Sequence, residues 1–165
     1  MNYILPQLLA RLQSKLGEFK FDGVFDAYGI EKNKGISVFK EDWQQELDFH
    51  YEIQQNEALP SNFYMRIDCH FHPYNESRGL KNDVYVRKYG KDKISKRIDL
   101  MKKTSKLIQK VCSFSCTTHG TWQDNALWLA KWDLSSFDNI DAVESAILDI
   151  ITQTKDMIDI IKKVL

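Results

Sequence analysis

The stretch 46–54, ELDFHYEIQ, alternates between apolar and polar side chains, and the stretch 63–72, FYMRIDCHFH, does the same. Alternation with a period of two is typical of a β-strand that buries one of its faces. The seven residues 56–62, which include a proline, separate the stretches by the length of a hairpin loop. We therefore predict two neighbouring antiparallel strands.

One pairing register satisfies both faces of this hairpin, namely the register in which paired residue numbers sum to 118. Apolar residues then face apolar residues, and three polar pairs carry complementary groups: Asp48 with His70, His50 with Asp68, and Glu52 with Arg66. Opposite charges across a strand pair contribute about 0.2–1 kcal/mol each, and a one-residue shift would lose all three pairs. The sequence thus predicts a sheet with one apolar core face and one exposed ionic face.

Three other segments have helical periodicity. Residues 3–19 place leucines on one face, residues 91–112 repeat apolar or small residues at alternating spacings of four and three, and residues from 141 onward do so for about 25 residues. Asp138 or Asp141 is the expected N-cap of the last helix, and Asp141 and Glu144 have the spacing of a capping box. Its long apolar seam also permits a homodimer through this C-terminal helix, although packing on the protein's own sheet is the default expectation.

Shorter segments complete the expected architecture. Residues 36–40, 84–89 and 126–134 have the composition of strands, although the length of the last segment also permits a helix. We therefore expect a single α+β domain over residues 1–165, with an antiparallel sheet of four to five strands. The long helices pack on one face of this sheet, and helices stand at both ends of the chain.

The composition excludes several classes of protein. Hydrophobic residues make up 43% and charged residues 28% of the chain, as in ordinary globular domains. No run of 18 apolar residues is present, so we expect no membrane span. Three cysteines are too few for a disulfide scaffold, and the first residues lack a secretory pattern, which favours a cytoplasmic location.

Charge is balanced overall but unevenly distributed. The 23 basic and 23 acidic residues cancel, which excludes a general electrostatic attraction to nucleic acid as the main mode of action. Between Arg78 and Lys110, however, twelve basic residues stand against three aspartates, whereas Glu41–Glu76 contains eight acids and one arginine. The basic helix 91–110 and the residues before it are therefore candidates for phosphate contacts; the residues chosen are Arg87, Lys88, Lys96, Lys103 and Lys110. Tyr85 and Tyr89 are candidates for base stacking, and a simply solvated lysine face is the competing interpretation.

The ionic face of the hairpin supplies weak catalytic candidates, which are His50, Asp68, Asp48 and Glu52. A carboxylate can orient an imidazole for acid–base chemistry, but no nucleophile is placed beside them by the sequence, so cross-strand ion pairing is the simpler interpretation. Cysteines and histidines at 112, 116 and 119 and at 69–72 contain donors for zinc, but their spacings match no familiar zinc motif. We expect no resident metal or other cofactor, apart from Mg²⁺ if the chain is a nuclease.

Two further segments, taken together with the hairpin, resemble a known protein family. The stretch 35–43, GISVFKEDW, precedes the first alternating strand, and the stretch 127–132, LWLAKW, precedes the long helix. Over residues 35–160 this arrangement resembles the C-terminal accessory region of uncharacterised bacterial and phage proteins of the PD-(D/E)XK nuclease superfamily. That family's catalytic signature ends in Asp/Glu-x-Lys, whereas neither of the nearest tripeptides here, at 31–33 and 52–54, has a lysine at its third position. No catalytic residue is carried over from the family.

These observations favour a non-enzymatic binding domain that acts through protein–protein contact in a bacterial or phage setting, with an association with defence systems or mobile elements implied by the resemblance. The alternatives are a metal-dependent nuclease-like enzyme and a nucleic-acid-binding protein. P-loop, dinucleotide-binding, nucleophile-elbow and zincin motifs are missing from the sequence, so those chemistries lack support.

Overall fold

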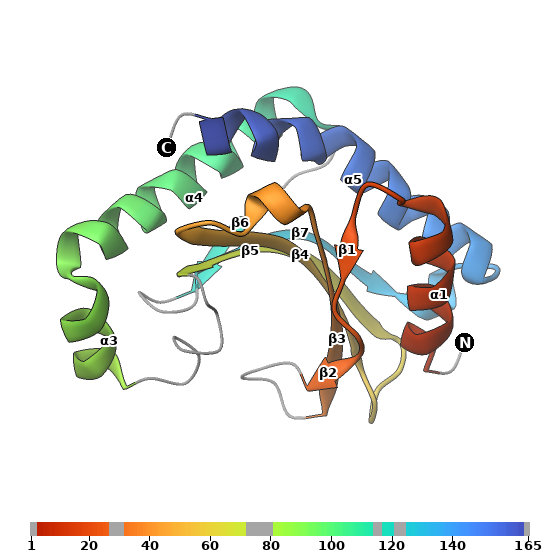
Figure 1. Cartoon of the computed structure of the whole chain (residues 1–165). Coiled ribbons are helices and arrows are strands. Elements are labelled where there is room, and N and C mark those ends of the chain that lie inside the picture. The colour runs from red at the N-terminus through yellow and green to blue at the C-terminus, as the bar shows by residue number, and fades with distance from the viewer. Residues whose placement is uncertain (1–2, 27–31, 72–80, 114–116, 121–124, 164–165) are drawn as a thin grey trace.

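A computed structural model describes residues 3–26, 32–71, 81–113, 117–120 and 125–163. Within these ranges, seven strands form one antiparallel sheet, accompanied by four α-helices, which confirms the predicted α+β class (Figure 1). The elements in chain order are α1 (Leu5–Lys15), β1 (Lys20–Phe21), β2 (Phe25–Asp26), β3 (Asn33–Phe39), η1 (Glu41–Trp43), β4 (Leu47–Asn56), β5 (Asn62–Phe71), α3 (Asn82–Tyr89), α4 (Lys91–Val111), β6 (Thr117–Gly120), β7 (Asn125–Asp133), η2 (Leu134–Ser136) and α5 (Ile140–Lys163).

The central hairpin has the predicted register. Strands β4 and β5 pair antiparallel, with Leu47 opposite Phe71 and His50 opposite Asp68. The sheet order is β1-β3-β4-β5-β7-β6, with β2 paired to β3. The strand count exceeds the predicted four to five because β1 and β2 contain two residues each. Strands this short show no alternating pattern in the sequence.

The helices α1, α4 and α5 lie over the convex face of the curved sheet (Figure 1). The seam of α5 is buried in the same core as the apolar residues of β4 and β5, and the Tyr51 hydroxyl is 2.6 Å from Thr154 Oγ1. The expected packing of α5 on its own sheet is therefore confirmed. None of the described helices combines the length and the apolar character that a bilayer crossing requires.

Residues 84–89, predicted as a strand, are instead part of the helix α3. The prediction was wrong because a segment of only six residues is too short to distinguish a period of two from a period of 3.6. Tertiary packing decides between them, since Tyr85 and Tyr89, one turn apart, both contact the ring of Phe71. Gly90, at φ +79°, then allows the sharp change of direction into α4.

The ends of two helices also differ from expectation. The first helix ends at Lys15 rather than near residue 19. The side chain that caps α5 is Asn139, whose Oδ1 accepts a hydrogen bond from Ala142 N, and not Asp138 or Asp141. Glu144, expected in a capping box, is buried and forms ion pairs with Arg11 and Lys15 of α1. A short-range motif was overridden here by a partner more than a hundred residues away.

The segment after β3 is fastened to α5 by a buried tryptophan. Trp43 is fully buried, and its indole Nε1 donates a 2.6 Å hydrogen bond to Asp159. Lys40 Nζ lies 2.7 Å from the other carboxylate oxygen of Asp159. Burial alone would raise the pKa of Asp159, but the hydrogen bonds from Lys40 and Trp43 outweigh burial and lower it.

We expect Asp159→Ala to lower the free energy of unfolding by about 1–3 kcal/mol, because the buried indole N–H loses its acceptor. Since the folded-state pKa of Asp159 is depressed, its stabilising effect is present above the unfolded-state value near pH 4 and is lost as the pH falls further. Urea denaturation followed by tryptophan fluorescence at pH 7 and pH 3 measures both effects. The exposed Asp156→Ala is the matched control, and equal effects from the two variants at pH 7 would contradict this account.

Candidate functional site

Two groups of charged side chains occupy different parts of the fold. The first, the ionic cluster, lies on the concave face of β4 and β5 and consists of Asp48, His50, Glu52, Arg66, Asp68 and His70. It contains all four weak catalytic candidates from the sequence. The second, the cationic pocket, lies where the beginning of β4, the end of β5, α4 and the end of α5 meet.

The ionic cluster is buried, which corrects the prediction of an exposed ionic face. Its six side chains belong to residues that are only 0 to 6% exposed. Alternation reveals which side chains share a face, but it does not reveal how strongly a sheet curves or what folds over it. Here the ring of Phe25, from β2, lies against Gly35 on this face, and the ring of Trp128, from β7, lies 5.6 Å from the guanidinium of Arg66.

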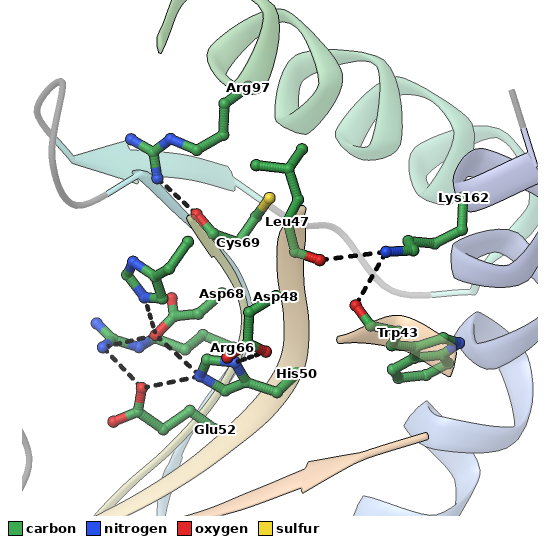
Figure 2. Close-up of polar contacts among 11 residues, drawn as sticks. Trp43, Leu47, Asp48, His50, Glu52, Arg66, Asp68, Cys69, Arg97 and Lys162 are labelled. Carbon is green, nitrogen blue, oxygen red and sulfur yellow. Dashed lines mark hydrogen bonds and ion pairs between the residues drawn. The ribbon is translucent and has the colours of Figure 1, made fainter. Parts of the chain in front are cut away.

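His50 is held by carboxylates on both sides of its ring (Figure 2). Its Nδ1 lies 3.2 Å from Asp48 Oδ1, and its Nε2 lies 3.9 Å from both Glu52 Oε2 and Asp68 Oδ2. Burial by itself would lower the pKa of His50, but the interactions with Asp48 and Glu52 outweigh burial and raise it to about 10. In the absence of another cation, this imidazole is therefore protonated at neutral pH.

Arg66 bridges the carboxylates of Glu52 and Asp68. Its Nη2 lies 3.0 Å from Glu52 Oε2 and 2.9 Å from Asp68 Oδ2 (Figure 2). Burial would raise the pKa of Asp68, but the charge of Arg66 and the nearby imidazole of His70 keep it below its usual range. Asp68 is thus a fixed anion, and its Oδ2 also lies 3.7 Å from His70 Nε2.

A neutral hydrogen-bond chain, which was not predicted from the sequence, continues the cluster toward β3. Gln54 Nε2 donates a 2.6 Å hydrogen bond to Glu52, and Asn33 Nδ2 donates a 3.1 Å hydrogen bond to Gln54. The polar half of the alternating pattern, which includes Gln54, is the signal that could have revealed this extension. The position of Asn33 depends on the β3–β4 register, which the sequence did not specify.

The cysteine and histidine groups considered for zinc separate in space or lie partly outside the described residues. Cys69 is buried on the core face, opposite in direction to His70 as alternation predicted, and burial raises the pKa of its thiol to about 12. Cys112 lies at the end of α4. Cys116 and His72, and the side chain of His119, lie outside the described part of the chain.

The five residues chosen for nucleic-acid contact do not form one surface patch with the aromatic candidates. Arg87 pairs with Asp83 on α3, and the ammonium of Lys88 lies over the ring of Tyr89. Tyr85, a stacking candidate, is only 2% exposed, because α3 directs it into the core. The remaining three are exposed on α4 at intervals of seven residues and therefore share one stripe: Lys96, Lys103 and Lys110.

The cationic pocket has a volume of about 530 Å³ and combines positive and apolar groups. Its lining residues are Gln45, Glu46, Leu47, Phe71, Lys93, Lys96, Arg97 and Lys162. Four of these eight residues are cations and one is an acid, and that acid, Glu46, pairs with Lys93 at 2.7 Å. The basic charge of the helix is evident in the sequence, but the pocket at its N-terminal end forms only where four elements meet.

Two of the pocket cations are fixed by backbone carbonyls (Figure 2). Lys162 Nζ donates to Trp43 O at 3.0 Å and to Leu47 O at 3.1 Å, and among the described carboxylates none forms an ion pair with it. Arg97, fully buried, donates from Nη1 to Cys69 O at 2.5 Å. Burial lowers the pKa of Lys162, so an incoming anion would stabilise its charged form.

We expect Arg66→Met to destabilise the fold by about 3–5 kcal/mol, because it leaves Glu52 and Asp68 buried without their shared cation. The matched control is Arg87→Met, whose side chain is 74% exposed and which should change stability by less than about 0.5 kcal/mol. Chemical denaturation at pH 7 measures both. A cost below about 1 kcal/mol for Arg66→Met would mean that the cluster is far more hydrated than the described burial implies.

Comparison of the chain with protein-family models, with curated proteins and with solved structures returns no match. The resemblance to the accessory region of PD-(D/E)XK proteins therefore remains a prediction. Function has to be inferred from the local geometry of the ionic cluster and the cationic pocket.

Proposed function

We propose that the chain is a non-enzymatic protein-binding domain that receives an acidic segment of a partner protein in the cationic pocket and along α4. The observation that carries the proposal is Lys162, whose ammonium is held by two backbone carbonyls in the wall of a pocket that is also lined by the exposed Lys93 and Lys96. Preorganised cations favour anion binding because little side-chain entropy remains to be lost.

The surface next to the pocket extends the positive charge. The solvent face of α4 has seven exposed lysines, at 91, 93, 96, 102, 103, 106 and 110, against the two exposed aspartates Asp92 and Asp99. A surface of one sign accelerates association with a partner of opposite sign and selects against partners of like sign. The lysine-rich face of α4 is thus suited to guiding an acidic segment toward the pocket.

The apolar part of the pocket favours a protein segment over a phosphate backbone. Leu47 and Phe71 contribute to the lining beside the cations. Specific protein interfaces combine an apolar centre with charged groups at the rim. A peptide in which carboxylates alternate with aliphatic side chains matches this mixture, and the bacterial or phage setting belongs to the proposal through the family resemblance.

Burial of the ionic cluster weighs against the enzyme alternative. General acid–base chemistry requires the substrate to reach within hydrogen-bond distance of the imidazole. Here His50 and Asp68 are 4% and 0% exposed, and their charges are already neutralised by neighbours. A binding surface outside the cluster requires no such access.

The direct test is fluorescence anisotropy with a labelled peptide of alternating glutamate and leucine, using the peptide of alternating glutamine and leucine as the uncharged probe. We expect the wild type to bind the acidic peptide, with an affinity that falls as salt rises. The double variant Lys93→Glu and Lys96→Glu should weaken binding by at least about tenfold, since each reversal replaces attraction by repulsion.

Lys131→Glu is the matched control. This exposed lysine of β7 lies beside Tyr64, at the end of β5 that is far from Phe71 and the pocket. It should leave peptide affinity unchanged. Equal loss in the control, equal affinity for the uncharged peptide, or no binding by the wild type at low salt would each overturn the proposal.

Nucleic acid is the second candidate ligand, and the observation that favours it is the exposed stripe of Lys96, Lys103 and Lys110. A phosphate-binding helix would give oligonucleotide affinity that falls steeply with salt and is lost in Lys103→Glu with Lys110→Glu. We expect the acidic peptide to bind more tightly than a single-stranded or duplex oligonucleotide of equal charge. The reverse order, with loss in this double variant, would replace the protein partner by nucleic acid.

Nuclease activity can be measured on supercoiled plasmid DNA and on RNA with Mg²⁺ or Mn²⁺. We expect no cleavage, because the carboxylates of the ionic cluster are enclosed and a nucleic-acid phosphate could not reach a metal ion held by them. Cleavage that disappears in Asp68→Ala, with the variant shown to be folded, would establish the enzyme alternative instead.

A further inference from the structure

The ionic cluster contains three donor groups that converge independently of the cationic pocket. Single donor atoms of His50, Asp68 and His70 all lie within 4.8 Å of one another, and all three residues are buried. The Nε2 atoms of His50 and His70 lie 3.9 and 3.7 Å from the same oxygen, Asp68 Oδ2. The two imidazole rings stack at a centroid distance of 5.7 Å, so both present their nitrogens to the same space.

We propose that His50, His70 and Asp68 form a binding site for one divalent transition-metal ion such as Zn²⁺. Two imidazoles and one carboxylate are a donor set that Zn²⁺ and neighbouring first-row ions accept. Metal–ligand bonds of about 2.0–2.2 Å put tetrahedral donor atoms roughly 3.4 Å apart. The observed separations from Asp68 Oδ2 therefore need to contract by only a few tenths of an ångström.

The surroundings of His50 support the same assignment. Asp48 Oδ1 lies 3.2 Å from His50 Nδ1 and can accept its proton, which leaves Nε2 as the metal-binding nitrogen. A carboxylate behind a ligating histidine is the usual arrangement in metal sites, where it fixes the tautomer and the ring orientation. Asp48 is thus a positioning residue for His50.

Charge balance provides an independent argument. With both imidazoles neutral, the three carboxylates and Arg66 of the ionic cluster carry a formal charge of −2, in a region that is at most 6% exposed. A buried net charge is costly unless it is compensated. One divalent ion brings the sum to zero.

Arg66 remains in place beside the metal. It also contacts Glu52 Oε2, at 3.0 Å, and lies over the ring of Trp128. Its Nη2 lies 2.9 Å from Asp68 Oδ2 as well, so a metal ion at this oxygen shares it with the guanidinium. Enclosure of all three donor residues points to a structural metal, which binds the folded state and raises its stability.

The test is calorimetric titration of Zn²⁺ into EDTA-stripped full-length protein, with the melting temperature measured before and after. We expect one Zn²⁺ per chain, an increase in melting temperature, and release of protons. Asp68→Asn and His70→Gln should each weaken Zn²⁺ binding by at least about 100-fold, and Asp48→Asn by about 10–100-fold. Co²⁺ should give a visible spectrum without the charge-transfer band of a thiolate ligand.

The controls use the other histidines and an exposed acid. The chain has four histidines, and His72→Gln, His119→Gln and Glu41→Gln should each retain wild-type affinity. Loss of binding in either histidine control, a thiolate band, unchanged affinity in Asp68→Asn and His70→Gln, or no binding by the folded wild type would overturn the proposal. Circular dichroism in EDTA identifies any variant that fails to fold. If Asp68→Asn fails, His70→Gln and the Co²⁺ spectrum of the wild type decide the outcome.

Discussion

The pairing register of β4 and β5 determines which side chains lie on each face of the sheet. It puts the apolar side chains of both strands under the helices and brings Asp48, His50, Glu52, Arg66, Asp68 and His70 together on the other face. A shift of one residue would expose the apolar set and bury unmatched charges, and both errors are costly. The complementary ion pairs and the core therefore specify the same pairing.

The two charged groups of the molecule differ in how much of their charge is already satisfied. In the ionic cluster, acids and bases lie close together and neutralise one another within a buried network. In the cationic pocket, the ammonium of Lys162 is oriented by two carbonyl oxygens, which are dipoles rather than anions. This difference is the physical basis for assigning an acidic partner to the pocket and a small cation to the cluster.

The long-range contacts of α5 link the pocket to the core. The helix is fastened by Glu144 to α1, by Thr154 to the sheet, and by Asp159 to Trp43. Lys162 follows on the same helix, so its ammonium is positioned by an element with several separate attachments. Rigid placement of this kind favours a preorganised binding site over a mobile loop.

Local patterns in the chain were sufficient to predict the α+β class, the strand pairing, the helices α4 and α5, and which side chains share the polar face, because periodicity and cross-strand complementarity are short-range signals. Burial of this polar face could not be predicted in the same way, since curvature and the placement of Phe25 and Trp128 depend on residues distant in the chain. The helical state of residues 84–89 also emerges only when the elements pack. The same holds for the burial of Arg97 in a helix whose lysines are exposed. Each of these outcomes depends on contacts between elements, which no spacing within one element encodes.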